Sequence, residues 1–110
     1  MTDDGWIEAL PLADVPDGKA TRVSLDGLNV LLARDGDRLF AITDRCSHQG
    51  APLSRGPVRF SGSLATVTCP LHGSQFALDT GKAIRGPATR PVDAYDVKVN
   101  GDVVYIRDRS

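Results

Sequence analysis

The sequence predicts an all-β fold for a single domain spanning residues 1–110. Apolar residues recur at a period of two in short runs, and no run carries a helical repeat of adequate length. Turn-forming pairs such as Asp26-Gly27, Asp35-Gly36 and Asn100-Gly101 separate these runs, and the chain contains 11 glycines. Its 41% of apolar residues suffice for one modest hydrophobic core.

The N-terminal half is predicted to contain four strands. Residues 6–10 and 20–25 form the first two, and a turn region with prolines and aspartates connects them. Residues 28–34 and 39–43 form a hairpin, because the Asp-Gly pair between them supplies the positive φ that a tight connection needs. Trp6 stands beside the first strand and is expected to lie in the core.

The C-terminal half is predicted to contain four more strands and one stiff, irregular segment. The strands are residues 64–68, 75–78, 92–99 and 102–106, with the last two joined at Asn100-Gly101. The irregular segment covers residues 85–91, because its two prolines fix φ and restrict the residues that precede them.

Two short motifs contain every cysteine and histidine of the chain. Cys46 and His48 form a C-x-H motif, Cys69 and His72 form a C-x-x-H motif, and the chain has two residues of each type. Thiolates and imidazoles suit either a tetrahedral zinc ion or an iron–sulfur cluster. Structural zinc sites commonly use a Cys-Cys pair and a His-His pair, whereas these mixed pairs fit a site with two metal atoms better. A zinc-stabilised interaction module remains the alternative.

These motifs closely resemble the fingerprint of the Rieske [2Fe–2S] family, C-x-H followed by C-x-x-H on two facing loops. The resemblance implies one cluster, in which Cys46 and Cys69 hold one iron and His48 and His72 hold the other. It also implies an antiparallel β-sandwich with a cluster-binding subdomain. Two ligand loops and a covering proline loop, which corresponds to residues 85–91, would form that subdomain.

The resemblance assigns supporting roles to four further residues. Gly50 and Gly73 are expected to let backbone N–H groups approach the sulfurs of the cluster, because glycine has no side chain in the way. Ser74 occupies the place of a serine whose hydroxyl bonds a bridging sulfide. Pro87 belongs to the covering loop.

Two departures from the quinol-oxidising branch of the family predict a low reduction potential. That branch has an additional, disulfide-forming cysteine in each motif, and this chain has Ala51 and Leu71 at those places. It also has a tyrosine that donates to a ligand sulfur, and this chain has Phe76 there. Loss of a donor to sulfur lowers the potential, toward the bottom of the class range of about −150 to +300 mV.

By resemblance, the chain is expected to be a Rieske ferredoxin, a one-electron carrier with no catalytic residues of its own. It would pass electrons from an FAD-dependent ferredoxin reductase to a terminal Rieske oxygenase that hydroxylates aromatic rings, as a dioxygenase component in aromatic hydrocarbon catabolism. Arg45 and Arg90 lie in or near the loops and are candidates for steering an acidic partner. An alternative is the small Rieske subunit of a nitrite-reductase-type complex.

Charge and hydropathy exclude other classes of function. The net charge is −1, and no basic run indicates nucleic-acid binding. The longest apolar run, residues 30–33, is too short to cross a bilayer, and the N-terminus does not resemble a signal peptide. With both cysteines assigned to metal, none is left for a disulfide, so we expect a cytoplasmic protein without a membrane span.

Overall fold

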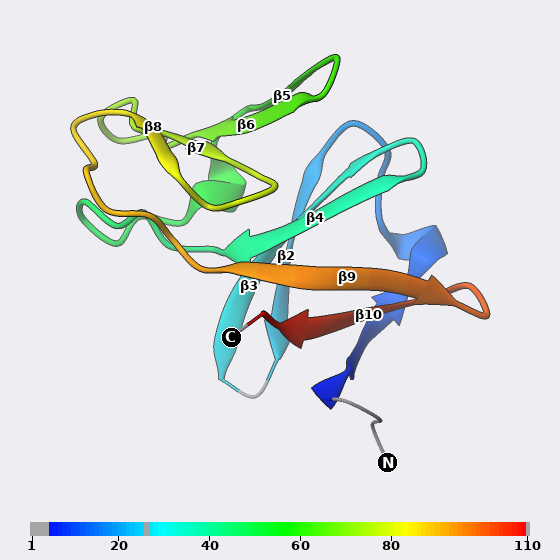
Figure 1. The fold of residues 1–110 in the computed structure, drawn as a ribbon. Coiled ribbons are helices and arrows are strands. Elements are labelled where there is room, and N and C mark those ends of the chain that lie inside the picture. The colour runs from blue at the N-terminus through cyan, green and yellow to red at the C-terminus, as the bar shows by residue number, and fades with distance from the viewer. Residues whose placement is uncertain (1–4, 26, 110) are drawn as a thin grey trace.

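The computed structural model describes residues 5–25 and 27–109 and contains two antiparallel β-sheets (Figure 1). The larger sheet has the order β1 (Ile7–Pro11), β10 (Val103–Asp108), β9 (Ala94–Asn100), β4 (Arg38–Thr43), β3 (Leu28–Asp35) and β2 (Ala20–Leu25). The smaller sheet has the order β5 (Val58–Ser61), β6 (Leu64–Thr68), β7 (Gln75–Ala77) and β8 (Ala83–Arg85). The all-β prediction is therefore confirmed.

The structure also contains two short 3-10 helices, η2 (Leu12–Asp14) and η3 (Leu53–Arg55). Neither was predicted, because each forms a single turn directly after a proline. In the part of the chain that the structure describes, no helix has the length and apolar character needed to cross a membrane.

Strand β3 separates two hydrophobic cores, because side chains of a strand alternate between the faces of its sheet. Leu31 and Ala33 belong to a core that also includes side chains of the smaller sheet, such as Phe76. Val30 and Leu32 belong to a second core with side chains of β9 and β10. This double burial explains the unbroken apolar run at residues 30–33. The first core joins the two sheets, whereas the second lies against the other face of the larger sheet.

The predicted hairpin turns are correct at β3–β4 and shifted by one residue at β9–β10. Asp35 pairs with Arg38, and Gly36 has a φ of 61°, as the Asp-Gly signal requires. In the last hairpin Asn100 pairs with Val103, so the turn residues are Gly101 and Asp102, with φ of 60° and 65°. Aspartate tolerates this left-handed conformation better than most residues, which permits the shift.

Three features of the fold differ from the sequence prediction. Strands β5 and β8 were not predicted, because both are short edge strands with few buried side chains. Trp6 was expected in the core but is only partly buried and lies outside both cores. Lys98 Nζ and Arg107 Cζ lie 4.5 and 4.3 Å from its ring centroid, so cationic side chains cover the indole instead.

Ion pairs with Asp96 tie the C-terminal strand to its neighbours. Arg107 and Arg109 each donate to the Asp96 carboxylate at 3.0 Å. Hydrogen bonds from Arg107 and then Arg109 hold the pKa of Asp96 below its usual value. Arg109 Nη1 also donates to the Asp79 carbonyl oxygen at 2.7 Å. Arg109 is thereby fastened to the turn that follows β7.

Candidate metal centre

Strand ends position the two predicted ligand motifs. Strand β4 ends at Thr43 and opens into the first ligand loop, residues 44–57, which carries Cys46 and His48. Strand β6 ends at Thr68 and opens into the second ligand loop, residues 69–74, which carries Cys69 and His72. The proline loop, expected at residues 85–91, covers residues 86–93 in the structure, because Arg85 belongs to β8 and β9 begins at Ala94. Figure 1 shows all three loops gathered at the same end of the molecule.

The two ligand loops share the same backbone hydrogen bonds. Cys46 N–H donates to Ala51 O at 2.8 Å, and Gly50 N–H donates to Cys46 O at 2.8 Å. In the second loop, Cys69 N–H donates to Ser74 O at 2.7 Å, and Gly73 N–H donates to Cys69 O at 3.1 Å. Each cysteine therefore occupies the same position in a tight loop, although its histidine follows at a different spacing.

The two glycines in these loops close the turns. Gly50 and Gly73 have φ of 76° and 80°, a left-handed conformation that other residues rarely adopt. Their own N–H groups donate to the carbonyl oxygen of the cysteine in the same loop. That these glycines let other backbone N–H groups approach the sulfurs of a cluster stays a prediction. Glycine therefore suits both positions, because the backbone has a positive φ there.

The four predicted ligands divide into a buried pair and an exposed pair. Both cysteines are free thiols, and Cys46 and Cys69 are 2% and 3% exposed. Both imidazoles are exposed, with His48 and His72 ring centroids 5.4 Å apart and their planes at 79°. Two thiols inside and two neighbouring imidazoles at the surface form a donor set that suits a Rieske centre.

A single metal ion and a two-iron cluster make different demands on these side chains. Among residues 5–25 and 27–109, no three His, Cys, Asp or Glu side chains are grouped so that they could hold one metal ion. A Rieske cluster needs only two protein ligands on each iron. The neighbouring imidazoles of His48 and His72 could meet that smaller requirement for one iron.

Serine hydroxyls fasten the proline loop to both ligand loops. Ser47 Oγ donates to Arg90 O at 2.5 Å, and Ala88 N–H donates to Ser74 Oγ at 3.0 Å. Ser74 is fully buried, and its hydroxyl still has a proton to donate because the bond from Ala88 uses only a lone pair. That proton is available to a sulfide, the partner expected for Ser74. Pro87 itself is exposed and follows a cis peptide bond.

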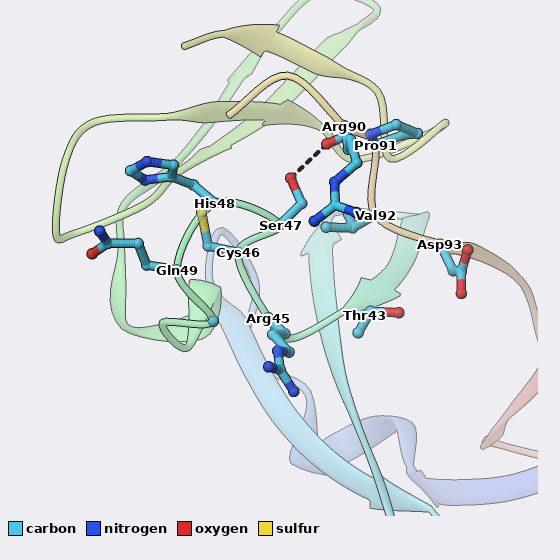
Figure 2. Close-up of a pocket in the computed structure, with 11 residues that line it drawn as sticks. Thr43, Arg45, Cys46, Ser47, His48, Gln49, Arg90, Pro91, Val92 and Asp93 are labelled. Carbon is cyan, nitrogen blue, oxygen red and sulfur yellow. Dashed lines mark hydrogen bonds between the residues drawn. The ribbon is translucent and has the colours of Figure 1, made fainter. Parts of the chain in front are cut away.

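No pattern in the sequence predicted the Ser47 contact. Ser47 stands between two ligands and resembles a spacer, and its partner lies 43 residues away in the chain. Figure 2 shows this hydrogen bond beside Cys46.

The predicted docking arginines border one open hollow of about 470 Å³ beside His48 (Figure 2). Arg45 extends away from the His48 ring, whereas Arg90 lies next to Ser47. Both arginines are exposed, and the sulfur of Cys46 lies between the positions of Arg45 and His48 in this view. The structure thus brings both cations to one hollow beside the first ligand loop.

Comparisons with known proteins agree on one family. The Rieske [2Fe-2S] domain description matches residues 5–96. The 3-phenylpropionate/cinnamic acid dioxygenase ferredoxin subunit of Escherichia coli (strain K12) is 44% identical over 100 residues, which cover 91% of each protein.

Two solved structures extend this similarity to the fold. The ferredoxin of carbazole 1,9a-dioxygenase from Nocardioides aromaticivorans IC177 has a TM-score of 0.86 and 33% identity, covering 96% of this chain and all of that one. A chain in a complex of reduced oxygenase and oxidized ferredoxin in carbazole 1,9a-dioxygenase has a TM-score of 0.81 and 30% identity, covering 96% of this chain and 94% of that one.

Proposed function

The chain belongs to the Rieske [2Fe–2S] family, and on this premise we propose that it is a ferredoxin that carries single electrons to a terminal, aromatic-ring-hydroxylating oxygenase. The observation that carries the proposal is the pair of exposed imidazoles, with ring centroids 5.4 Å apart, in the same two loops as two buried thiols. The names of the relatives support the role of ferredoxin subunit, and the carbazole complex shows such a ferredoxin with its oxygenase. These relatives favour the role of an oxygenase ferredoxin over that of a nitrite-reductase subunit.

The cofactor of the family is one Rieske-type [2Fe–2S] cluster, which when bound supplies reversible one-electron transfer. We assign Cys46 and Cys69 as the ligands of one iron, and His48 and His72 as the ligands of the other. Because both cysteines are buried, water has little access to the sulfur atoms that would bind iron. The exposed imidazole edges place the second ligand pair where a partner protein can dock, within the small interface that electron-transfer pairs use.

The surroundings of the proposed cluster support a low potential. Phe76 is fully buried and carries no hydroxyl, so it offers no hydrogen bond to a ligand sulfur. We place the midpoint toward the lower end of the class range of about −150 to +300 mV.

The wider setting of this carrier also follows from the proposal. The electrons would come from an FAD-dependent ferredoxin reductase, in the cytoplasm, and the chain would form a single domain over residues 1–110. The aromatic substrate would bind to the oxygenase rather than to this carrier.

Spectroscopy of the purified protein tests the proposal most directly. We expect a coloured protein with about two irons and two acid-labile sulfides per chain. Its dithionite-reduced form should give an EPR signal at lower average g than clusters ligated by four cysteines. Potentiometric titration of the same sample should give a midpoint below zero. A colourless protein with one zinc would replace this proposal with the zinc-stabilised module.

Charge reversal at the two arginines tests the proposed docking surface. Arg45→Glu and Arg90→Glu are expected to slow electron transfer with an acidic partner by on the order of tenfold at low salt. The difference should vanish near 1 M salt, where the Debye length falls to about 3 Å. Stopped-flow rates at several ionic strengths measure the effect.

Arg59→Glu provides the matched control for these variants. Arg59 is exposed on β5 and does not border the hollow. The Arg59→Glu substitution changes the net charge by the same amount, so the electron-transfer rate of this variant reports the effect of overall charge. Equal rates for Arg90→Glu and Arg59→Glu at low salt would contradict steering through the hollow.

A further inference from the structure

Asp44 is a buried carboxylate at the start of the first ligand loop. Its side chain is 0% exposed, and it lies two residues before Cys46. Arg22 Nε donates to Oδ2 at 2.7 Å, and Ser54 donates twice, from its N–H to Oδ1 at 2.6 Å and from its Oγ to Oδ2 at 2.6 Å. Both carboxylate oxygens are therefore bonded, by donors from two separate segments.

The bonds of Asp44 join four elements of the fold. Arg22 lies on β2, Ser54 lies on η3, and Asp44 itself follows the last residue of β4. The backbone N–H of Asp44 donates to Asn29 O, on β3, at 2.9 Å. The start of the ligand loop is thereby fastened to the rigid larger sheet.

The same bonds close the ligand loop at its far end. Asp44 and Ser54 stand ten residues apart, and the ligands Cys46 and His48 lie between them. Leu53, next to Ser54, is fully buried in the same core as Cys46. A shift of Ser54 away from Asp44 would move Leu53 and disturb the packing around the cysteine.

Stability alone does not explain a charged group at this position. A buried carboxylate loses its hydration, and well-packed apolar residues often stabilise a fold as well as a buried ion pair does. A carboxylate does offer two equivalent acceptor oxygens in fixed directions, which an apolar residue cannot. Here those directions set the distance between the two ends of the ligand loop.

We propose that Asp44 is a positioning residue, which holds Cys46 and His48 in the geometry that the cluster requires by fastening both ends of their loop. The inference rests on the proposed function and adds to it the group that pre-organises one ligand pair. Hydrogen bonds from neighbouring residues keep a ligand pair oriented when a bond to metal opens. Such a pair therefore loses metal slowly and changes its geometry little.

Asp44→Asn in the cluster-containing protein tests the inference. Asparagine keeps the shape but replaces one acceptor oxygen by an NH2 group, which faces a donor. We expect iron release to a chelator to accelerate by about tenfold or more. We also expect a changed EPR spectrum of the reduced protein, and faster hydrogen exchange of the amides in residues 44–54.

Two further variants keep the test decisive. Ser54→Ala removes only the hydroxyl donor, so it should change the same readouts in the same direction by a smaller factor, even if Asp44→Asn fails to fold. Asp35→Asn is the matched control, because Asp35 forms a half-exposed pair with Arg38 on the β3–β4 hairpin. It should leave iron release and the EPR spectrum unchanged.

The outcomes separate this inference from the proposed function. A wild-type chain that takes up no cluster would overturn the proposed function, and this inference with it. A wild-type chain with a normal cluster, together with Asp44→Asn and Ser54→Ala proteins that unfold at lower temperature but match it in EPR spectrum and iron release, would overturn this inference alone.

Discussion

The Cys69→Ser variant is expected to be purified without iron or acid-labile sulfide. A buried thiolate is the soft, anionic ligand that iron–sulfur clusters require, and a serine hydroxyl at neutral pH is neither soft nor ionised. Cys69 is only 3% exposed, so water and other side chains have little access to replace the lost ligand. Iron and sulfide assays, with the absorption spectrum, measure the loss.

Leu71→Ala is the control for that substitution. Leu71 lies in the same loop, two residues after Cys69, but is 58% exposed and belongs to neither core. It should keep the full iron content, because removal of an exposed side chain leaves the loop backbone unchanged. A Cys69→Ser protein with two irons and the wild-type EPR spectrum would contradict the ligand assignment.

Because the two ligand loops have equivalent backbone hydrogen bonds, we expect the same loss of cluster when Cys46 is replaced. Each cysteine N–H bonds the carbonyl five residues ahead, and each cysteine carbonyl accepts from a glycine four residues ahead. Cys46→Ser should therefore lose the cluster as completely as Cys69→Ser. Unequal losses would show that the shared hydrogen bonds do not give the two thiols equal roles.

Candidate ligands could be proposed from the sequence because the chemistry of such a site depends on rare residues. The chain has two cysteines and two histidines, and their pairing within short motifs carries the signal without any knowledge of the fold. Strands β2 and β6 were predicted with correct bounds, since each is a short β-forming run bounded by turns.

The supporting contacts could not be predicted, because they join residues that only the fold brings together. Arg22 and Asp44 are 22 residues apart, and Ser47 and Arg90 are 43 residues apart. No local pattern marks either pair, and aspartate and serine are ordinary loop residues. Strand β8 was not predicted for a related reason. Its three residues are mostly exposed and form a strand only because they pair with β7.

Gly56 shows how closely the two ligand loops approach each other. It lies at the end of the first loop, with a φ of −92° that any residue can adopt. A Cβ at this position would lie 1.8 Å from Thr68 O and 3.2 Å from Pro70 Cδ. Thr68 and Pro70 flank Cys69, so the bare Cα of Gly56 packs directly against the base of the second ligand loop.

The Gly56→Ala variant is therefore expected to lose both stability and cluster. The collision involves a backbone oxygen, which no rotamer change can relieve, and Thr68 N–H is already held by Pro57 O at 3.0 Å. We expect a loss of about 3 kcal/mol in the free energy of unfolding, the upper end of the usual cost of overpacking. Iron content should fall as well, because any relaxation moves the backbone next to Cys69.

Gly62→Ala separates this collision from the general cost of replacing a glycine. Gly62 has a φ of 60° in the β5–β6 turn, and no atom lies within 4 Å of a Cβ built there. Its substitution should cost about 1–2 kcal/mol of left-handed strain and leave the iron content intact. Urea unfolding of both variants, with and without cluster, measures the difference. If Gly56→Ala kept as much iron as Gly62→Ala, the spacing of the two ligand loops would not depend on the missing side chain at Gly56.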